Sequence, residues 1–282
     1  MSFVADLFSA AGRTAVITGG GTGLGYWMAE AWVKNGGKVY IAGRRAEVLK
    51  QAAAKLNDIA DNSAFFFAAD LSNQQGVDSL ATEISSRETS LDVLVNNAGF
   101  AMFDPLRPGE ILPQFNLDNW SKWYTVNCWA PAALTSALAP LLVKAAKKGE
   151  GRGSVILITS IADDTWFAAS QMTGCSLSKV AEGALTKILA NKLVAYGVRV
   201  NAIAPGTFPT PSNDPSNERM PSGRPEQMVP MKRNGTADDI AGAFLFLATK
   251  ASAYVTGQKF AVDGGWSMVV NGPPHSSVND HV

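Results

Sequence analysis

The chain has 282 residues, 46% of them hydrophobic, and its 24 Lys and Arg residues equal its 24 Asp and Glu residues in number. This length suits one doubly wound α/β domain with an ample core, and the balanced charge excludes a global basic field for nucleic acid or a membrane surface. The first residues lack the pattern of a signal peptide and no stretch approaches about 18 apolar residues, so we expect a cytoplasmic protein that does not enter membranes.

Cysteine and histidine usage excludes further classes. The cysteines, Cys128 and Cys175, are too few for a disulfide framework or a metal cluster, and the histidines, His275 and His281, stand in a polar tail. We therefore expect no metal site and no histidine catalysis.

Strand and helix patterns alternate along the chain. A β-branched run at residues 13–18 ends in glycines, and residues 24–35 then form a predicted helix that Gly36 and Gly37 close. Further strands are predicted at residues 38–42, 64–69, 91–95, 154–159, 198–204 and 259–262. This alternation predicts a single Rossmann-type domain, whose seven-stranded parallel sheet carries helices on both faces.

Two irregular stretches interrupt the alternation, at residues 100–117 and 206–235, and we interpret both as substrate loops and the second as a lid. The predicted dinucleotide-binding domain covers residues 1–270. Residues 271–282, rich in Pro, Ser and Asn, form a predicted flexible tail.

The strongest functional signal is the glycine-rich segment between the first strand and the first helix. Glycines there allow backbone N–H groups and the helix N-terminus to approach a pyrophosphate. The predicted contacts are Gly19, Gly21, Thr22, Gly23, Leu24 and Gly25. Arg44 and Arg45 end the second strand, where an NAD-selective site usually carries an acid. Two guanidinium groups suit a 2′-phosphate, so we expect NADP(H).

Further motifs follow the glycine-rich loop: Asp70-Leu71 after the third predicted strand, Asn96-Asn97-Ala98-Gly99 after the fourth, and Pro205-Gly206 after the sixth. In order and spacing, these motifs and the loop resemble the short-chain dehydrogenase/reductase family over almost the whole chain. The resemblance implies that Asn127, Ser160 and Lys179 match three members of the family's Asn-Ser-Tyr-Lys catalytic tetrad, and that Lys179 also holds the nicotinamide ribose. It also implies cofactor contacts at Asp70, Leu71, Asn97, Ala98, Gly99, Pro205, Gly206 and Thr210.

The chain departs from that family at one position. Cys175 stands four residues before Lys179, where the family carries the Tyr that protonates the oxyanion formed by hydride transfer to a carbonyl. A thiol is shorter than a phenol, although Lys179, one helical turn away, could favour its thiolate. Loss of a general acid typically removes about 10² to 10⁴ of rate.

A retained cofactor site without this acid suggests a hydride acceptor that needs no proton. An iminium ion is such an acceptor, and an activated C=C is a second. Asp163 and Asp164 follow Ser160, and we consider Asp163 a source of negative charge or an acid. Trp166 and Phe167, with Cys175, are the predicted lining of a pocket for an aromatic or alkaloid-like substrate.

The missing Tyr together with Asp163 and Trp166 also resembles a branch of the family in fungal alkaloid pathways, the bifunctional reductase/Diels–Alderases. That branch uses an Arg beside the tetrad Asn, whereas Cys128 follows Asn127 here.

We favour an NADP(H)-dependent reductase of an iminium or similar acceptor in specialised metabolism. Three alternatives stay open: a pericyclase on this scaffold, a non-catalytic NADP(H)-binding protein, and a carbonyl reductase in which Cys175 has replaced Tyr. The family resemblance and the apolar stretch at residues 181–195 indicate a homodimer or homotetramer.

Overall fold

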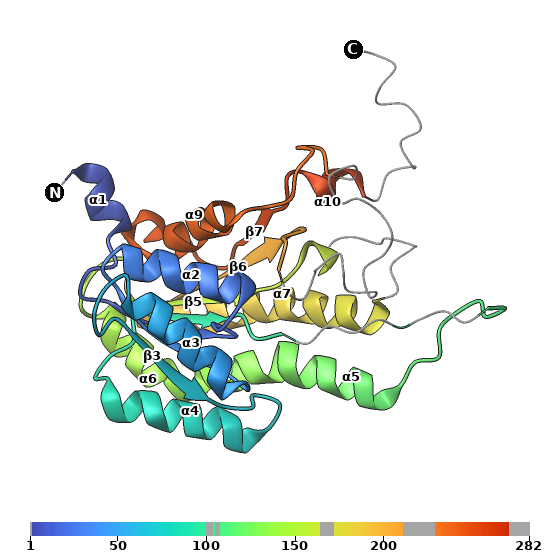
Figure 1. The fold of residues 1–282 in the computed structure, drawn as a ribbon, viewed down its shortest axis with the longest axis horizontal. Coiled ribbons are helices and arrows are strands. Elements are labelled where there is room, and N and C mark those ends of the chain that lie inside the picture. The colour runs from blue at the N-terminus through green and yellow to red at the C-terminus, as the bar shows by residue number, and fades with distance from the viewer. Residues whose placement is uncertain (1, 100–103, 105–107, 164–171, 211–228, 271–282) are drawn as a thin grey trace, which may run out of the picture.

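The computed structural model describes residues 2–99, 104, 108–163, 172–210 and 229–270. Its centre is one seven-stranded, entirely parallel sheet with the strand order β3-β2-β1-β4-β5-β6-β7 (Figure 1). The strands are β1 (Thr14–Thr18), β2 (Lys38–Gly43), β3 (Ala64–Ala68), β4 (Val93–Asn96), β5 (Ser154–Ile158), β6 (Arg199–Pro205) and β7 (Lys259–Val262).

Helices separate the strands along the chain and cover the sheet. They are α1 (Phe3–Phe8), α2 (Gly23–Lys34), α3 (Ala46–Asn57), α4 (Gln74–Arg87), α5 (Leu117–Tyr124), α6 (Ala130–Ala146), α7 (Thr173–Leu193), α9 (Ala237–Ala248) and α10 (Trp266–Val269). Shorter turns are the π-helical η1 (Thr125–Trp129) and the 3₁₀ turns η2 (Ile161–Asp163), η3 (Val194–Tyr196) and η4 (Lys250–Ser252).

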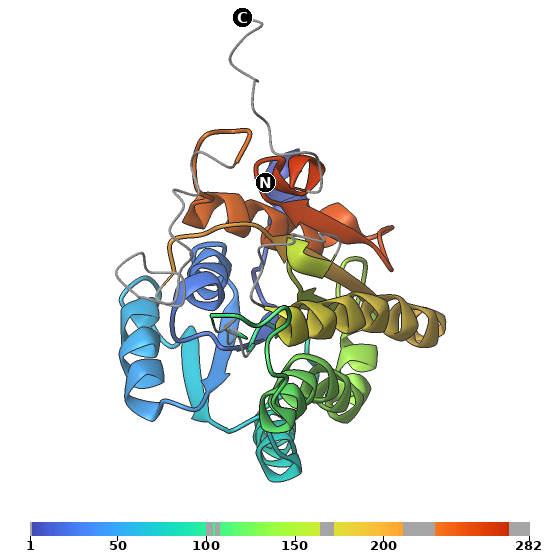
Figure 2. The same ribbon diagram turned by 90° about the vertical axis from the view of Figure 1, so that its right-hand side faces the viewer.

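The core lies on both faces of the sheet because side chains alternate along each strand. Ile17 and Ile41 belong to the cluster that includes α2, α3 and α9, whereas Val16 and Tyr40 belong to the cluster that includes α4, α6 and α7. Figure 2 shows the sheet between its two layers of helices. The predicted fold class is confirmed, and the predicted strands agree with the observed ones to within two residues.

One continuous helical stretch, Leu117–Ala146, is long and apolar enough to cross a membrane by length and composition, because an 18-residue window within it has a mean hydropathy of 1.4. The expectation that no such stretch exists is therefore wrong. Leu134, Leu138 and Leu142 of this stretch are completely buried in a core cluster of the domain. This burial is what the core helix of a doubly wound sheet requires.

The strand order alone indicates where a ligand binds on the sheet. The chain runs from β1 outwards to β3 and then returns to β4 on the other side of β1. In open α/β sheets, ligands bind at the carboxyl ends of the strands where the order reverses. Here that point lies between the ends of β1 and β4.

Candidate functional site

The glycine-rich loop between β1 and α2 is closely packed against the end of β4. A Cβ atom on Gly25 would lie 2.4 Å from the carbonyl oxygen of Gly19 and 2.5 Å from Nδ2 of Asn97. Gly19 and Gly23 have φ angles of +66° and +57°, which other residues rarely adopt. The loop can therefore present its backbone to a ligand only with glycine at these positions.

A hydroxyl group joins the ends of β1 and β4. Oγ1 of Thr18 accepts hydrogen bonds from the backbone N–H groups of Asn97 and Ala98, each at 2.9 Å, and donates one to Val95 O at 3.2 Å. Nδ2 of Asn97 donates to Thr18 O at 2.8 Å. These bonds fix Asn97, Ala98 and Gly99, the predicted cofactor contacts that follow β4, beside the glycine-rich loop.

Two exposed arginines follow β2 on the other side of the loop. Arg44 and Arg45 are exposed, and Nη2 of Arg45 donates to Oγ1 of Thr22 at 3.4 Å. Thr22 is the N-cap residue of α2 and makes no side-chain cap bond of its own. The Arg45 guanidinium thus stands at the N-terminus of α2, where a phosphate is expected.

Asp70 and Leu71, predicted as cofactor contacts after β3, have different environments. Asp70 is exposed, and its Oδ1 accepts from the backbone N–H of Ser72 at 3.0 Å. The side chain of Leu71 is only 6% exposed and belongs to the core cluster with Val77 and Leu80. The Leu71 side chain is therefore core, which leaves its backbone for a cofactor contact.

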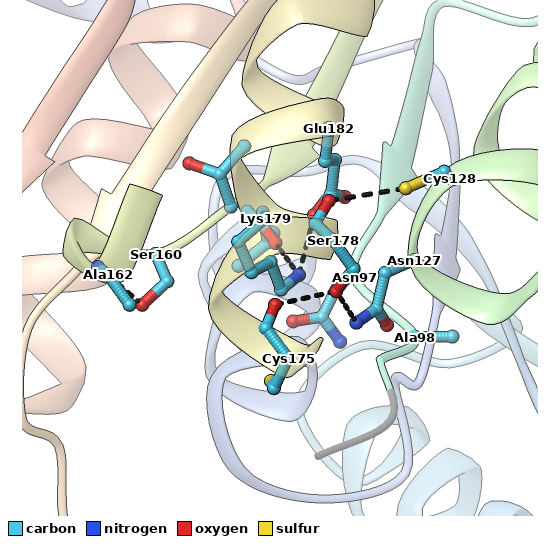
Figure 3. Close-up of polar contacts among 12 residues, drawn as sticks. Asn97, Ala98, Asn127, Cys128, Ser160, Ala162, Cys175, Ser178, Lys179 and Glu182 are labelled. Carbon is cyan, nitrogen blue, oxygen red and sulfur yellow. Dashed lines mark hydrogen bonds and ion pairs between the residues drawn. The ribbon is translucent and has the colours of Figure 1, made fainter. Parts of the chain in front are cut away.

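Asn127 on η1 lies close to Cys175 and Lys179 on α7, whereas Ser160 lies apart from them (Figure 3). Asn127, fully buried in the π-helical turn η1, donates from Nδ2 to Oγ of Ser178 at 2.9 Å, and Ser178 donates to the carbonyl oxygen of Cys175 at 2.6 Å. Oδ1 of Asn127 would lie 3.6 Å from a Cβ atom on Gly99. These contacts bring Asn127 and Cys175 together beside the switch point.

The Cys175 side chain is buried, which decides its protonation state. Burial raises the pKa of the Cys175 thiol to about 11, with a further increase from Glu182 and Asp104, and only Lys179 opposes the shift. Lys179 does lower the pKa of the thiol, as expected, but desolvation outweighs the attraction of the ammonium, so no thiolate results. At neutral pH the group is a neutral thiol.

Lys179 lies in an ion pair that sequence reasoning missed. Its Nζ is 2.6 Å from Oε2 of Glu182, one helical turn along α7, and donates at 2.8 Å to the carbonyl oxygen of Ile158 at the end of β5 (Figure 3). The Lys-x-x-Glu spacing on a predicted helix was a signal that could have found this partner. Burial of Glu182 could not be read from spacing alone.

Ser160 and Asp163 follow β5. Ser160 makes a contact within its own loop, and Asp163 pairs with a residue of β7. Oγ of Ser160 accepts from the backbone N–H of Ala162 at 3.1 Å, inside the same loop. Asp163 is buried and pairs with Lys259 of β7 at 2.9 Å, and its Oδ2 would lie 3.2 Å from a Cβ atom on Gly183. Gly183 is about 12 Å along α7 from Cys175 at helical rise, so the Asp163 carboxylate does not neighbour the thiol.

The segment after β6 is positioned by close contact with the chain after β7. Gly206 donates its N–H to Val262 O at 3.0 Å, and a Cβ atom on Gly206 would lie 2.8 Å from Cα of Asp263. This contact fixes the end of the predicted Pro205-Gly206 motif. The backbone N–H of Thr210 donates to Phe208 O at 2.8 Å, so Thr210 continues this segment.

The predicted substrate lining is seen only in part. Trp166 and Phe167 lie outside the described residues. Trp123 is completely buried, and a Cβ atom on Gly174 would lie 2.3 Å from its ring, so this tryptophan packs against the first turn of α7. Asp104, which sequence reasoning did not single out, is 3% exposed and accepts from the Gly174 N–H at 3.3 Å.

Comparisons with known proteins agree with this geometry. The family model described as enoyl-(acyl carrier protein) reductase matches residues 19–267. The chain is 34% identical over 275 residues to the short-chain dehydrogenase/reductase PhomF of Diaporthe leptostromiformis, and the match covers 93% of both chains.

Solved structures give the same result. The chain is similar to the RhlG/NADP active-site complex of Pseudomonas aeruginosa, with 31% identity, a TM-score of 0.82, and coverage of 93% of this chain and 99% of that chain. It is also similar to a gluconate 5-dehydrogenase of Burkholderia cenocepacia in complex with NADP and tartrate, with 28% identity, a TM-score of 0.80, and coverage of 94% and 99%. Both hold NADP, the cofactor that the sequence predicted here. The chain belongs to the short-chain dehydrogenase/reductase family.

Proposed function

We propose that the chain is an NADP(H)-dependent reductase of specialised metabolism whose main acceptor is an iminium ion. The observation that carries this proposal is Cys175, a buried thiol with a pKa raised to about 11, at the position of α7 where the family carries its acid. Lys179 is bound to Glu182 and to the Ile158 carbonyl oxygen. The helix therefore offers the acceptor no strong acid at this position.

The cofactor assignment rests on the loop and the two arginines. The N-terminus of α2 and the glycine-rich loop suit the pyrophosphate, and Arg44 and Arg45 suit the 2′-phosphate. Asn97 and Gly99 line the path towards the nicotinamide at the ends of β1 and β4. When bound, NADPH supplies a hydride to the acceptor, and the solved relatives with NADP support this choice.

The acceptor follows from the balance of charges. Hydride addition to a ketone carbon produces an alkoxide, which needs a proton. Hydride addition to the carbon of an iminium cation moves the C=N π electrons to nitrogen and produces a neutral amine, so no proton is required. An activated C=C is the weaker second acceptor, because the carbanion formed can take its proton later from water.

We propose that the assembly is a homodimer or homotetramer in which α7 contributes to the interface. Its side chains Leu177, Val180 and Ile188 are 37%, 37% and 52% exposed, an apolar set that a partner subunit would cover. Light scattering coupled to size-exclusion chromatography tests this assembly. A cytoplasmic location and an aromatic, alkaloid-like substrate stay predictions of the sequence.

The decisive experiment is NADPH oxidation with a cyclic iminium, such as a dihydro-β-carbolinium, and with a matched aryl ketone. Native protein and Cys175→Tyr are compared. We expect the native protein to reduce only the iminium, and the variant to gain little ketone reduction. A large gain in ketone reduction by the variant would identify a carbonyl reductase that lost its Tyr. NADPH binding with turnover of neither acceptor would favour the pericyclase or the non-catalytic alternative.

A further inference from the structure

Glu182 is a buried carboxylate beside the predicted nicotinamide end of the site. Its side chain is 2% exposed and that of its partner Lys179 is 13% exposed, so water screens this ion pair weakly. The Nζ–Oε2 distance is 2.6 Å, and the Ile158 carbonyl oxygen accepts a second hydrogen bond from the same ammonium group. The ammonium therefore has one fixed position (Figure 3).

That position borders the ligand site. Nζ of Lys179 would lie 3.9 Å from a Cβ atom on Gly99, the residue that follows β4 by the switch point of the sheet. A charge on Lys179 alone would act directly on any ring bound against Gly99. Oxidised nicotinamide is a cation, and so is an iminium ion, whereas reduced nicotinamide is neutral.

We propose that Glu182 is a specificity-determining residue: its carboxylate neutralises Lys179 and so lets the site accept a cationic ring. The ring is the oxidised nicotinamide and, if the proposed function holds, the iminium substrate. Without Glu182, the Lys179 ammonium would repel both cations. For unit charges about 8 Å apart at an effective dielectric constant of about 20, the repulsion weakens binding about tenfold or more.

The other ionisable groups around Glu182 do not replace it. Asp163 on η2 is already paired with Lys259, and the thiols of Cys128 on η1 and Cys175 on α7 both have pKa values raised to about 11 by burial. Those thiols are neutral at physiological pH. Among the residues that the structure describes, the ion pair beside Gly99 is that of Lys179 with Glu182.

The pH dependence has a defined sign. Burial raises the pKa of Glu182 to about 7, with Lys179 opposing the shift and Asp163 adding to it. Above this pKa the pair is neutral, and below it the protonated carboxyl leaves Lys179 as an uncompensated cation. The preference of the site for NADPH over NADP⁺ should therefore increase as the pH falls.

The test measures the dissociation constants of NADP⁺ and NADPH by calorimetry between about pH 6 and about pH 9, on either side of the raised pKa. For the native protein we expect the ratio of NADP⁺ to NADPH dissociation constants to rise about tenfold as the pH falls. For Glu182→Gln we expect the higher ratio at every pH, because the amide cannot ionise. The 2′-phosphate titrates in both cofactor forms, so it cancels in the ratio.

Glu88→Gln is the matched control, since Glu88 also pairs with a lysine, Lys38, at the opposite edge of the sheet. Its ratio should follow that of the native protein. A native ratio that does not change with pH, or a Glu182→Gln ratio equal to the native one, would overturn the inference. The native profile needs no variant, so a variant that fails to fold leaves that test standing. Absence of NADPH binding by the native protein would overturn the proposed function as well.

Discussion

The two halves of the site at the carboxyl edge of the sheet are built by different means. In the cofactor half, backbone atoms approach so closely that a Cβ atom on Gly25 has no space beside Gly19 and Asn97. In the acceptor half, α7 positions its groups through side-chain pairs, above all Lys179 with Glu182. The first half is thus sensitive to added volume, and the second to changed charge.

The largest expected effect is a loss of NADPH binding when one methyl group is added to the glycine-rich loop. Gly25→Ala would place a Cβ atom 2.4 Å from Gly19 O, which the backbone can relieve only by moving the loop. We expect NADPH affinity to fall by more than about 100-fold, because the loop no longer presents its N–H groups to the pyrophosphate. Titration of NADPH by fluorescence measures this.

Gly242→Ala is the control for that change. Gly242 lies inside α9, and a Cβ atom there would meet nothing within 4 Å. We expect unchanged NADPH affinity and a slight stabilisation, since alanine favours helix over glycine by about 1 kcal/mol. Equal losses in both variants would show that glycine replacement in general, and not the close approach at Gly25, impairs the protein.

In the acceptor half, the corresponding change removes one charge from the buried Lys179–Glu182 pair. Lys179→Met leaves Glu182 as an unpaired buried carboxyl, and we expect the free energy of unfolding to fall by about 3 kcal/mol at pH 8. The pKa of Glu182 is raised in the folded state, so this state binds the proton more tightly than the unfolded chain does. The loss should therefore grow as the pH rises through about 7.

Urea unfolding of the variant at pH 6 and pH 8 (about one unit either side of that pKa) measures this dependence. The double variant Lys179→Met/Glu182→Leu removes both charges and should recover most of the stability at the higher pH. A single variant as stable as the native protein at both pH values would show that the pair does not compensate a buried charge.

The same contrast explains what the sequence could predict. Strands and the glycine-rich loop follow from alternation and from glycine at fixed spacing, so the sheet and the position of Gly25 could be derived. Glu182 could not, because its significance depends on burial after α7 packs on the sheet. Asp104 escaped for the same reason: it accepts from the Gly174 N–H across a wide separation in sequence.

A smaller effect on NADPH affinity is expected in the cofactor half from Arg44 and Arg45, which act by charge and not by shape. We expect Arg44→Ala/Arg45→Ala to weaken NADPH binding about tenfold to 100-fold, the contribution of charge-assisted hydrogen bonds to a phosphate. NADH, which lacks the 2′-phosphate, should bind as before. Lys50→Ala removes an exposed cation from α3, the helix whose N-cap residue is Arg45, and should change neither affinity. A parallel loss for NADPH and NADH would contradict the assignment of the arginines to the 2′-phosphate.

The smallest expected effect concerns the residue that departs from the family pattern. Burial keeps the Cys175 thiol neutral, with a pKa of about 11, and an iminium acceptor needs no proton from it. Cys175→Ala should therefore change the rate of iminium reduction by less than about twofold, since only a small volume is lost. Cys128→Ala serves as a control for the loss of a thiol near the same lysine. A fall of more than about tenfold for Cys175→Ala alone would make the thiol a proton donor in the reaction. The acceptor half would then depend on an acid at position 175 after all, and the acceptor would be one that forms an anion.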